Sequence, residues 1–195
     1  MPSTPSRRIL MCVCGTSPAV ITETLYALLQ QIPSFVPDEI HVVTTLTGKH
    51  MIEKTLLAPD VGHFHRFVRD YLPKRAVRFD DSTVHVISEE MTVMAPANPF
   101  AGLLGMPSSA QTITQLVALD DIASGTDNEA AADAIYRVMR ELKAQPGTLL
   151  HASVAGGRKS MSFYMGHAFS LLAEPHDTLS HVLVNKPFEE TQLQF

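Results

Sequence analysis

Two glycines, two cations and a serine stand together at positions 156–160, in the order Gly-Gly-Arg-Lys-Ser. An apolar run at 148–154 precedes them and an amphipathic run at 161–173 follows, which predicts a strand, a turn and a helix. Glycine lets a backbone approach a ligand closely, and the start of a helix offers free N–H groups and the positive end of its dipole. Because Arg158 and Lys159 add formal charge, this turn has the composition of a phosphate site.

A second turn of this kind lies near the start of the chain, between an apolar run at 9–14 and a helical pattern at 19–31. It consists of four residues: Gly15, Thr16, Ser17 and Pro18. Proline suits the first helical turn, with Ser17 as the expected N-cap. In open α/β sheets ligands bind beyond the carboxyl ends of the strands, so two such turns suggest one shared anion site. The alternative is that the glycines only make tight turns and the cations are solvated.

Strands and helices alternate along the rest of the chain. Strands are expected at 39–45, 84–88, 148–154 and 180–184, and helices at about 48–57, 61–72, 127–143 and 159–173. This alternation is typical of an open α/β sheet. The segment 89–119 holds three prolines and no steady period, so an irregular connection is expected there. We therefore expect a single domain over 1–195, with a core at about 9–188.

Composition limits the partners. The chain has 45% hydrophobic and 18% charged residues, as globular proteins do, and no run of 18 apolar residues. A soluble cytoplasmic protein without a membrane partner is expected. The formal net charge of −5 disfavours a duplex DNA surface, so a nucleotide ligand would be small and locally held. Cys12 and Cys14 share one side of a strand and are expected as buried, reduced thiols.

Several other kinds of site fit the sequence less well. The spacing of a Walker phosphate loop and the dinucleotide pattern G-x-G-x-x-G are both missing, and Ser17 lacks the following glycine of a hydrolase elbow. The nine histidines show no spacing typical of a zinc site. Arg78 and His85 satisfy the loose R-x4-6-H pattern of HEPN ribonucleases, but they straddle a turn and a strand where that site needs a helix.

Two stretches in combination resemble CARF (CRISPR-associated Rossmann fold) domains. They are Cys-Gly-Thr-Ser-Pro-Ala-Val-Ile-Thr-Glu-Thr-Leu-Tyr at 14–26 and Ser-Val-Ala-Gly-Gly-Arg-Lys-Ser-Met at 153–161. Leu-Asp-Asp-Ile at 119–122, with Asp127 and Asn128, resembles the ring nucleases of type III CRISPR systems within that group. The resemblance covers about 9–188, nearly the whole chain.

The resemblance implies a Rossmann-like fold: an open, mainly parallel sheet with helices on both faces. It also implies a homodimer that binds cyclic oligoadenylate, most of all cyclic tetra-adenylate, across its two-fold axis. Ring nucleases of this group cut the ring without metal or cofactor, using a ribose 2′-OH on the adjacent phosphate and leaving 2′,3′-cyclic phosphate ends. They thereby switch off antiviral signalling.

Carried onto this sequence, the family's motifs assign catalytic roles to Ser17, as a phosphate-contacting hydroxyl, and Lys159, as the essential cation. The ligand-binding residues would be Gly15, Thr16, Pro18, Gly156, Gly157, Arg158 and Ser160. No residue stands out as a general base. Two alternatives stay open: a non-catalytic sensor that activates an effector domain or partner, and an unrelated nucleotide-binding α/β protein. Many relatives carry a C-terminal HEPN ribonuclease domain, so the chain is expected to stand alone or to be a piece of a longer protein.

Overall fold

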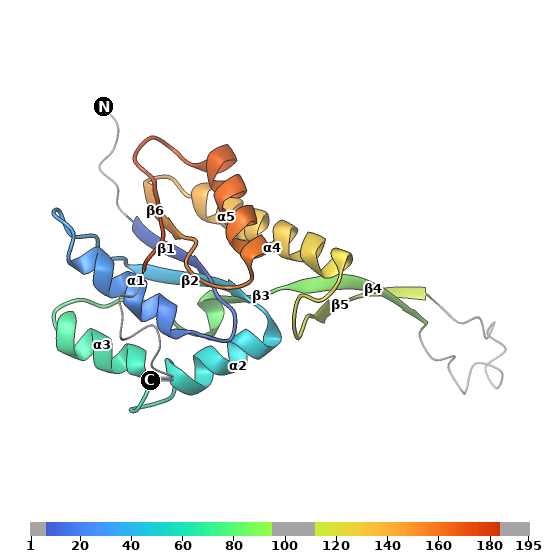
Figure 1. Cartoon of the computed structure of the whole chain (residues 1–195), viewed down its shortest axis with the longest axis horizontal. Coiled ribbons are helices and arrows are strands. Elements are labelled where there is room, and N and C mark those ends of the chain that lie inside the picture. Colours follow the sequence, from blue (N-terminus) through green and yellow to red (C-terminus); the bar gives the residue numbers. More distant parts are fainter. Residues whose placement is uncertain (1–6, 95–111, 184–195) are drawn as a thin grey trace, which may run out of the picture.

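The computed structural model describes residues 7–94 and 112–183, and a five-stranded sheet forms its centre (Figure 1). The strands are β1 (Arg7–Val13), β2 (Glu39–Thr44), β3 (Val84–Val86), β6 (Thr148–Ser153) and β7 (Thr178–Ser180). They lie in the order β3-β2-β1-β6-β7, and every neighbouring pair is parallel. Helices cover both faces of this sheet. The expected Rossmann-like open α/β fold is therefore confirmed.

The central strand β1 serves two hydrophobic cores, because successive side chains of a strand point to opposite faces. Ile9, Met11 and Val13 pack in one core against the helices α4 (Gly125–Lys143) and α5 (Lys159–Leu172). The other core combines Leu10, Cys12 and Cys14 with the helices α1 (Ala19–Leu29), α2 (Leu46–Thr55) and α3 (His63–Tyr71). Both faces of β1 are thus buried, which explains its unbroken apolar sequence.

The two cysteines behave as expected. Both are buried, reduced and on the same face of the sheet. Burial raises the pKa of the Cys14 thiol to about 12 and that of Cys12 still further. Such thiols stay protonated and unreactive at neutral pH.

Helix ends differ from expectation in two places. The N-cap of α1 is Pro18 and not Ser17, and no side chain in the described part of the chain caps this helix, so the N-cap role expected of Ser17 is wrong. Helix α4 begins two residues before the expected start, because Ser124 and Asp127 form a capping box: the Ser124 hydroxyl accepts from the Asp127 N–H at 3.0 Å. The last strand, β7, is shorter and earlier than the expected 180–184.

The segment 89–119 is not irregular throughout, which corrects the sequence-based expectation. Strands β4 (Ser88–Met94) and β5 (Thr112–Ala118) pair antiparallel along seven residue pairs, and residues 95–111 lie outside the described part. This two-stranded ribbon projects from the body (Figure 1). Its root is bonded to the central sheet, since the Ile87 N–H donates to the Thr44 carbonyl at 2.8 Å and the Leu119 N–H to the Ile87 carbonyl at 2.9 Å.

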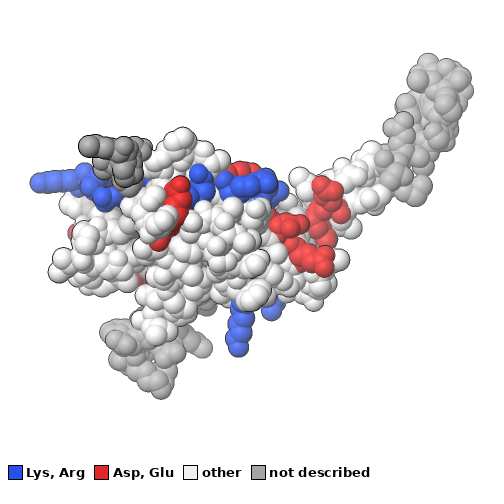
Figure 2. All heavy atoms as spheres, turned by 90° about the horizontal axis from the view of Figure 1, so that it is seen from above, with Lys and Arg blue, Asp and Glu red and all other residues white. Residues whose placement is uncertain are grey.

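Charge is unevenly distributed over the surface. Acidic side chains gather where the ribbon leaves the body (Figure 2). A hollow there, between the ribbon and α4, is lined by four carboxylates: Glu89, Glu90, Glu129 and Asp133. Within 7–94 and 112–183, no helix is long and apolar enough to cross a membrane.

Candidate anion-binding cavity

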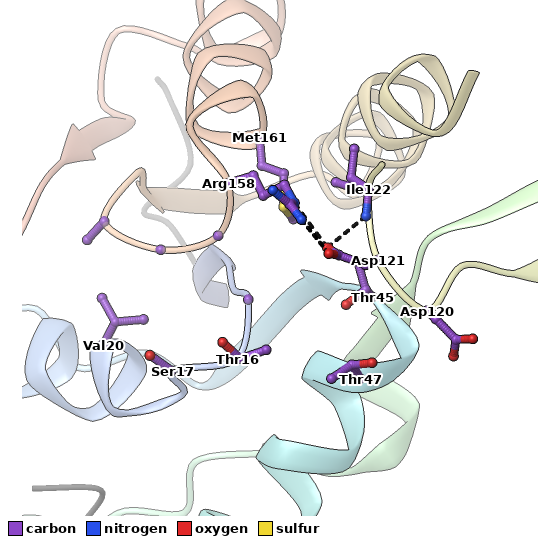
Figure 3. Close-up of a pocket in the computed structure, with 14 residues that line it drawn as sticks. Thr16, Ser17, Val20, Thr45, Thr47, Asp120, Asp121, Ile122, Arg158 and Met161 are labelled. Atoms are coloured by element: carbon purple, nitrogen blue, oxygen red, sulfur yellow. Dashed lines mark hydrogen bonds and ion pairs between the residues drawn. The ribbon is translucent and has the colours of Figure 1, made fainter. Parts of the chain in front are cut away.

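Three strand-to-helix turns meet at the carboxyl edge of the sheet and enclose a cavity of about 410 Å³ (Figure 3). Two are the turns expected from the sequence, which follow β1 and β6. The third follows β2 and leads into α2. The connection from β5 to α4, at 120–122, completes the wall of the cavity. The residues that line the cavity are Gly15, Thr16, Ser17, Val20, Thr45, Thr47, Asp120, Asp121, Ile122, Ala155, Gly156, Gly157, Arg158 and Met161.

Glycines let these turns pack directly on one another. A Cβ placed on Gly15 would lie 3.5 Å from the Gly157 Cα, so the turns after β1 and β6 lie within van der Waals reach of each other. At Gly156 a Cβ would lie 2.4 Å from the carbonyl oxygen of Val13, where no side chain fits. Gly157 adopts a φ of 74°, which glycine accepts without strain. The sheet order explains the meeting, because β6 and β1 are neighbours.

Helix N-termini at the cavity supply hydrogen-bond donors. Within 7–94 and 112–183, no side chain caps the first turn of α1 or of α5, so the described side chains leave the N–H groups there uncapped. At α2, by contrast, the Thr45 hydroxyl accepts from the Gly48 N–H at 3.3 Å. Four hydroxyl side chains also line the cavity: Thr16, Ser17, Thr45 and Thr47. Such an arrangement of neutral donors is suited to an anionic ligand.

One ion pair joins two segments of the cavity wall, the turn after β6 and the connection from β5 to α4. The Arg158 Nε donates to the Asp121 Oδ1 at 3.0 Å, and its Nη2 forms a second, ionic contact with Oδ2 (Figure 3). Asp121 Oδ1 also accepts the N–H of Ile122 at 2.8 Å. The hydrogen bond from Arg158 is the main cause that lowers the pKa of Asp121, so this carboxylate is ionised at neutral pH.

The cavity unites most, but not all, of the residues expected at the site. Gly15, Thr16, Ser17, Gly156, Gly157 and Arg158 line it, whereas Pro18, Lys159 and Ser160 do not. Pro18 is buried, Ser160 is half-buried, and Lys159 is the exposed first residue of α5. Within one chain the serine expected to be catalytic therefore shares the cavity with Arg158, while Lys159 stands outside it.

Other lining residues had no expected role. Thr45 and Thr47 belong to the third turn, whose pattern Thr-Leu-Thr-Gly after a strand is an N-cap signal in the sequence. However, no local feature of the sequence indicates that β2 is the neighbour of β1, so this turn could not be assigned to the site. Asp120 and Asp121 entered only through the family resemblance. The side chains of Val20 and Met161 carry no chemical signal.

Two other clusters of polar side chains lie away from the cavity. Arg78 and His85 do line one hollow, but Arg78 donates to Glu39 at 3.2 Å and His85 bonds His41 at 2.9 Å. Neither stands on a helix, as expected from the sequence.

Among the described residues, one group has metal-ligand proximity: Glu174, His176 and Asp177. The ammonium of Lys143 already lies 2.7 Å from Glu174 and 2.8 Å from Asp177, so a cation is in place without a metal.

The fold and the cavity define an α/β protein with a cavity at the carboxyl edge of a parallel sheet. Within that class, the chain belongs to the family described as CRISPR-associated protein NE0113 (Cas_NE0113), whose model matches residues 17–96 and 108–195. The match includes Ser17 and the Gly-Gly-Arg turn. It confirms the CRISPR-associated part of the resemblance.

Among solved structures, the chain is similar to "Enterococcus italicus Csm6 bound to cyclic hexa-2′-fluoro-hexa-dAMP", with 11% sequence identity and a TM-score of 0.44. The similarity covers 94% of this chain and 34% of that one, so the chain spans about a third of its length. No curated protein matches the chain in sequence.

Proposed function

We propose that this protein binds cyclic oligoadenylate in the three-turn cavity and cleaves it as a metal-independent ring nuclease of type III CRISPR signalling. The observation that carries the proposal is the close packing of the Gly156 backbone on the end of β1, which brings both glycine turns to one cavity beside Arg158 in a chain of a CRISPR-associated family. Hydroxyls and helix N–H groups around one cavity suit the phosphates of such a ring. Cyclic tetra-adenylate is the preferred ligand in this proposal.

The reaction is an internal transesterification. A ribose 2′-oxygen forms a bond to the adjacent phosphorus while the bond from phosphorus to the 5′-oxygen breaks, which leaves a 2′,3′-cyclic phosphate and a free 5′-hydroxyl. The proton of the 2′-hydroxyl goes to solvent, and the 5′-oxygen takes one up. Catalysis requires the three atoms in line and stabilisation of the charged phosphorane-like state. Ser17 orients the phosphate, and Lys159 stabilises its charge.

In the proposed homodimer, Lys159 of both copies adds positive charge that the cavity of one chain does not have. Among the described residues, the charged ones that line the cavity are Arg158, Asp120 and Asp121, which sum to a formal charge of −1. A ring with four phosphates would be poorly held by that surface alone. In the proposed dimer the two-fold axis places two cavities on one ring and directs both Lys159 ammonium groups to it.

The deciding experiment incubates pure protein with cyclic tetra-adenylate and, separately, cyclic hexa-adenylate in EDTA under single-turnover conditions, and separates the products by chromatography. Linear products with 2′,3′-cyclic phosphate ends are expected. Lys159→Ala should raise the activation free energy of cleavage by a few kcal/mol, and Ser17→Ala should raise it as well. Lys54→Ala, an equal charge change on the exposed end of α2, is the matched control and should cleave like wild type.

The second candidate is a sensor that binds the ring without cutting it. The observation that favours it is the position of Lys159 outside the cavity of the single chain. Tight binding of cyclic tetra-adenylate in calorimetry, together with an intact ring after long incubation, would select the sensor over the nuclease. Absence of binding to either ring would reject both.

A further inference from the structure

The ion pair between Arg158 and Asp121 presents a difficulty for any anionic ligand of the cavity. Among the described residues that line the cavity, Arg158 is the only cation. Its Nε and Nη2 both contact the carboxylate of Asp121. A carboxylate and a phosphate use the same planar edge of a guanidinium for two parallel bonds. Asp121 thus occupies the contact that a phosphate of the ligand would make.

Arg158 can leave its ion pair with Asp121 and pair with another anion at low cost. The Arg158 and Asp121 side chains are 54% and 58% exposed, and ion pairs at that exposure are weak. Asp121 does not depend on Arg158 for its place, because the backbone N–H of Ile122 also holds its Oδ1 at 2.8 Å. Arg158 can therefore turn to another anion while the carboxylate keeps a hydrogen-bond partner.

We propose that Asp121 is a built-in competitor for Arg158 and thereby determines which anions the cavity accepts. A lone phosphate gains little by taking Arg158 from Asp121. A ligand that places one phosphate on Arg158 and others on the hydroxyls and helix N–H groups of the neighbouring turns offsets the exchange with several contacts at once. The proposal rests on the proposed function, since it refines how the same cavity selects a multiply charged ligand.

The test is a gain of affinity, which misfolding cannot mimic. Calorimetry would compare wild type with Asp121→Asn, which keeps the size of the side chain and its acceptor oxygen for Ile122. Asp120→Asn is the matched control, because Asp120 lines the same cavity and carries the same charge, whereas the carboxylate paired with Arg158 is that of Asp121. Asp121→Asn should bind cyclic tetra-adenylate about fivefold more tightly than Asp120→Asn does. In an Arg158→Gln background, the two aspartate substitutions should have equal effects.

Equal affinities of Asp121→Asn and Asp120→Asn with Arg158 present, or weaker binding by Asp121→Asn, would overturn the competitor role. The same series titrated with inorganic tripolyphosphate separates this role from the proposed function. If wild type binds tripolyphosphate but no cyclic oligoadenylate, the proposed function fails while the aspartate comparison is still decided by tripolyphosphate. If neither probe binds wild type or Asp121→Asn, the cavity is no anion site and both proposals fall.

Discussion

Substitution of Gly156 by alanine tests whether the cavity depends on backbone contact between its turns. The new Cβ would lie 2.4 Å from the Val13 carbonyl oxygen, a backbone atom that ends the central strand. Carbon and oxygen atoms approach each other to about 3.3 Å at the closest in weak contacts. The turn would therefore have to move by about 1 Å, away from the strand. Forced overpacking of this kind costs about 1–3 kcal/mol.

Urea unfolding measures that cost, and Gly166→Ala is the matched control. Gly166 lies in α5, where a Cβ would meet nothing within 4 Å, so alanine there should stabilise the protein by about 0.5–1 kcal/mol. Gly156→Ala should lower the free energy of unfolding by about 2 kcal/mol and weaken binding of cyclic tetra-adenylate as the turns separate. If Gly156→Ala unfolds within 0.5 kcal/mol of wild type and binds equally well, the close packing of the turns is not what shapes the cavity.

Three further predictions concern buried groups that do not line the cavity. Burial lowers the pKa of His151 to about 4, below its ordinary 6.5. The stability contributed by its neutral form is therefore complete above pH 6.5 and declines as the pH falls. Between pH 7 and 4.5, the free energy of unfolding of wild type should fall by about 2 kcal/mol more than that of His151→Gln. Cys12 and Cys14 should resist a disulfide thiol reagent in the native protein at pH 8, and both should react once urea unfolds it. Lys143→Met leaves the fully buried carboxylate of Asp177 without its cation, and thermal or urea unfolding should show a loss of about 3 kcal/mol.

Much of the fold can be predicted from the sequence because its central elements have strong local signals. Strand β1 is buried on both faces and therefore reads as an unbroken apolar run, and Pro18 and Gly156 mark the turns that follow the two central strands. Helix α4 shows a clear 3.6-residue period because one side of it packs on the sheet. Each of these segments has a regular pattern of apolar residues because it is buried against a neighbouring element.

The ribbon of β4 and β5 could not be predicted for the same reason. Most of its side chains are exposed, including Leu116 at 62% and Ile113 at 45%, so apolar and polar residues do not alternate in a regular way. The expected cap at Ser17 is wrong because the N-cap of the helix lies one residue later, at Pro18. The third turn of the cavity was missed because strand adjacency is a long-range property that Thr45 and Thr47 do not carry locally.

The pairing of β1 with β6 joins the seventh to twelfth residues to a segment about 140 positions later, as in the partners Cys12 and Ser153. Such distant pairing costs loop-closure entropy before any contact is gained and slows folding. During synthesis, an emerging β1 has β2 beside it but must wait for most of the chain before its second edge is covered. The cavity requires both segments, so it can form only after β6 has been synthesised. An incomplete chain that lacks β6 therefore has no cavity for a ligand.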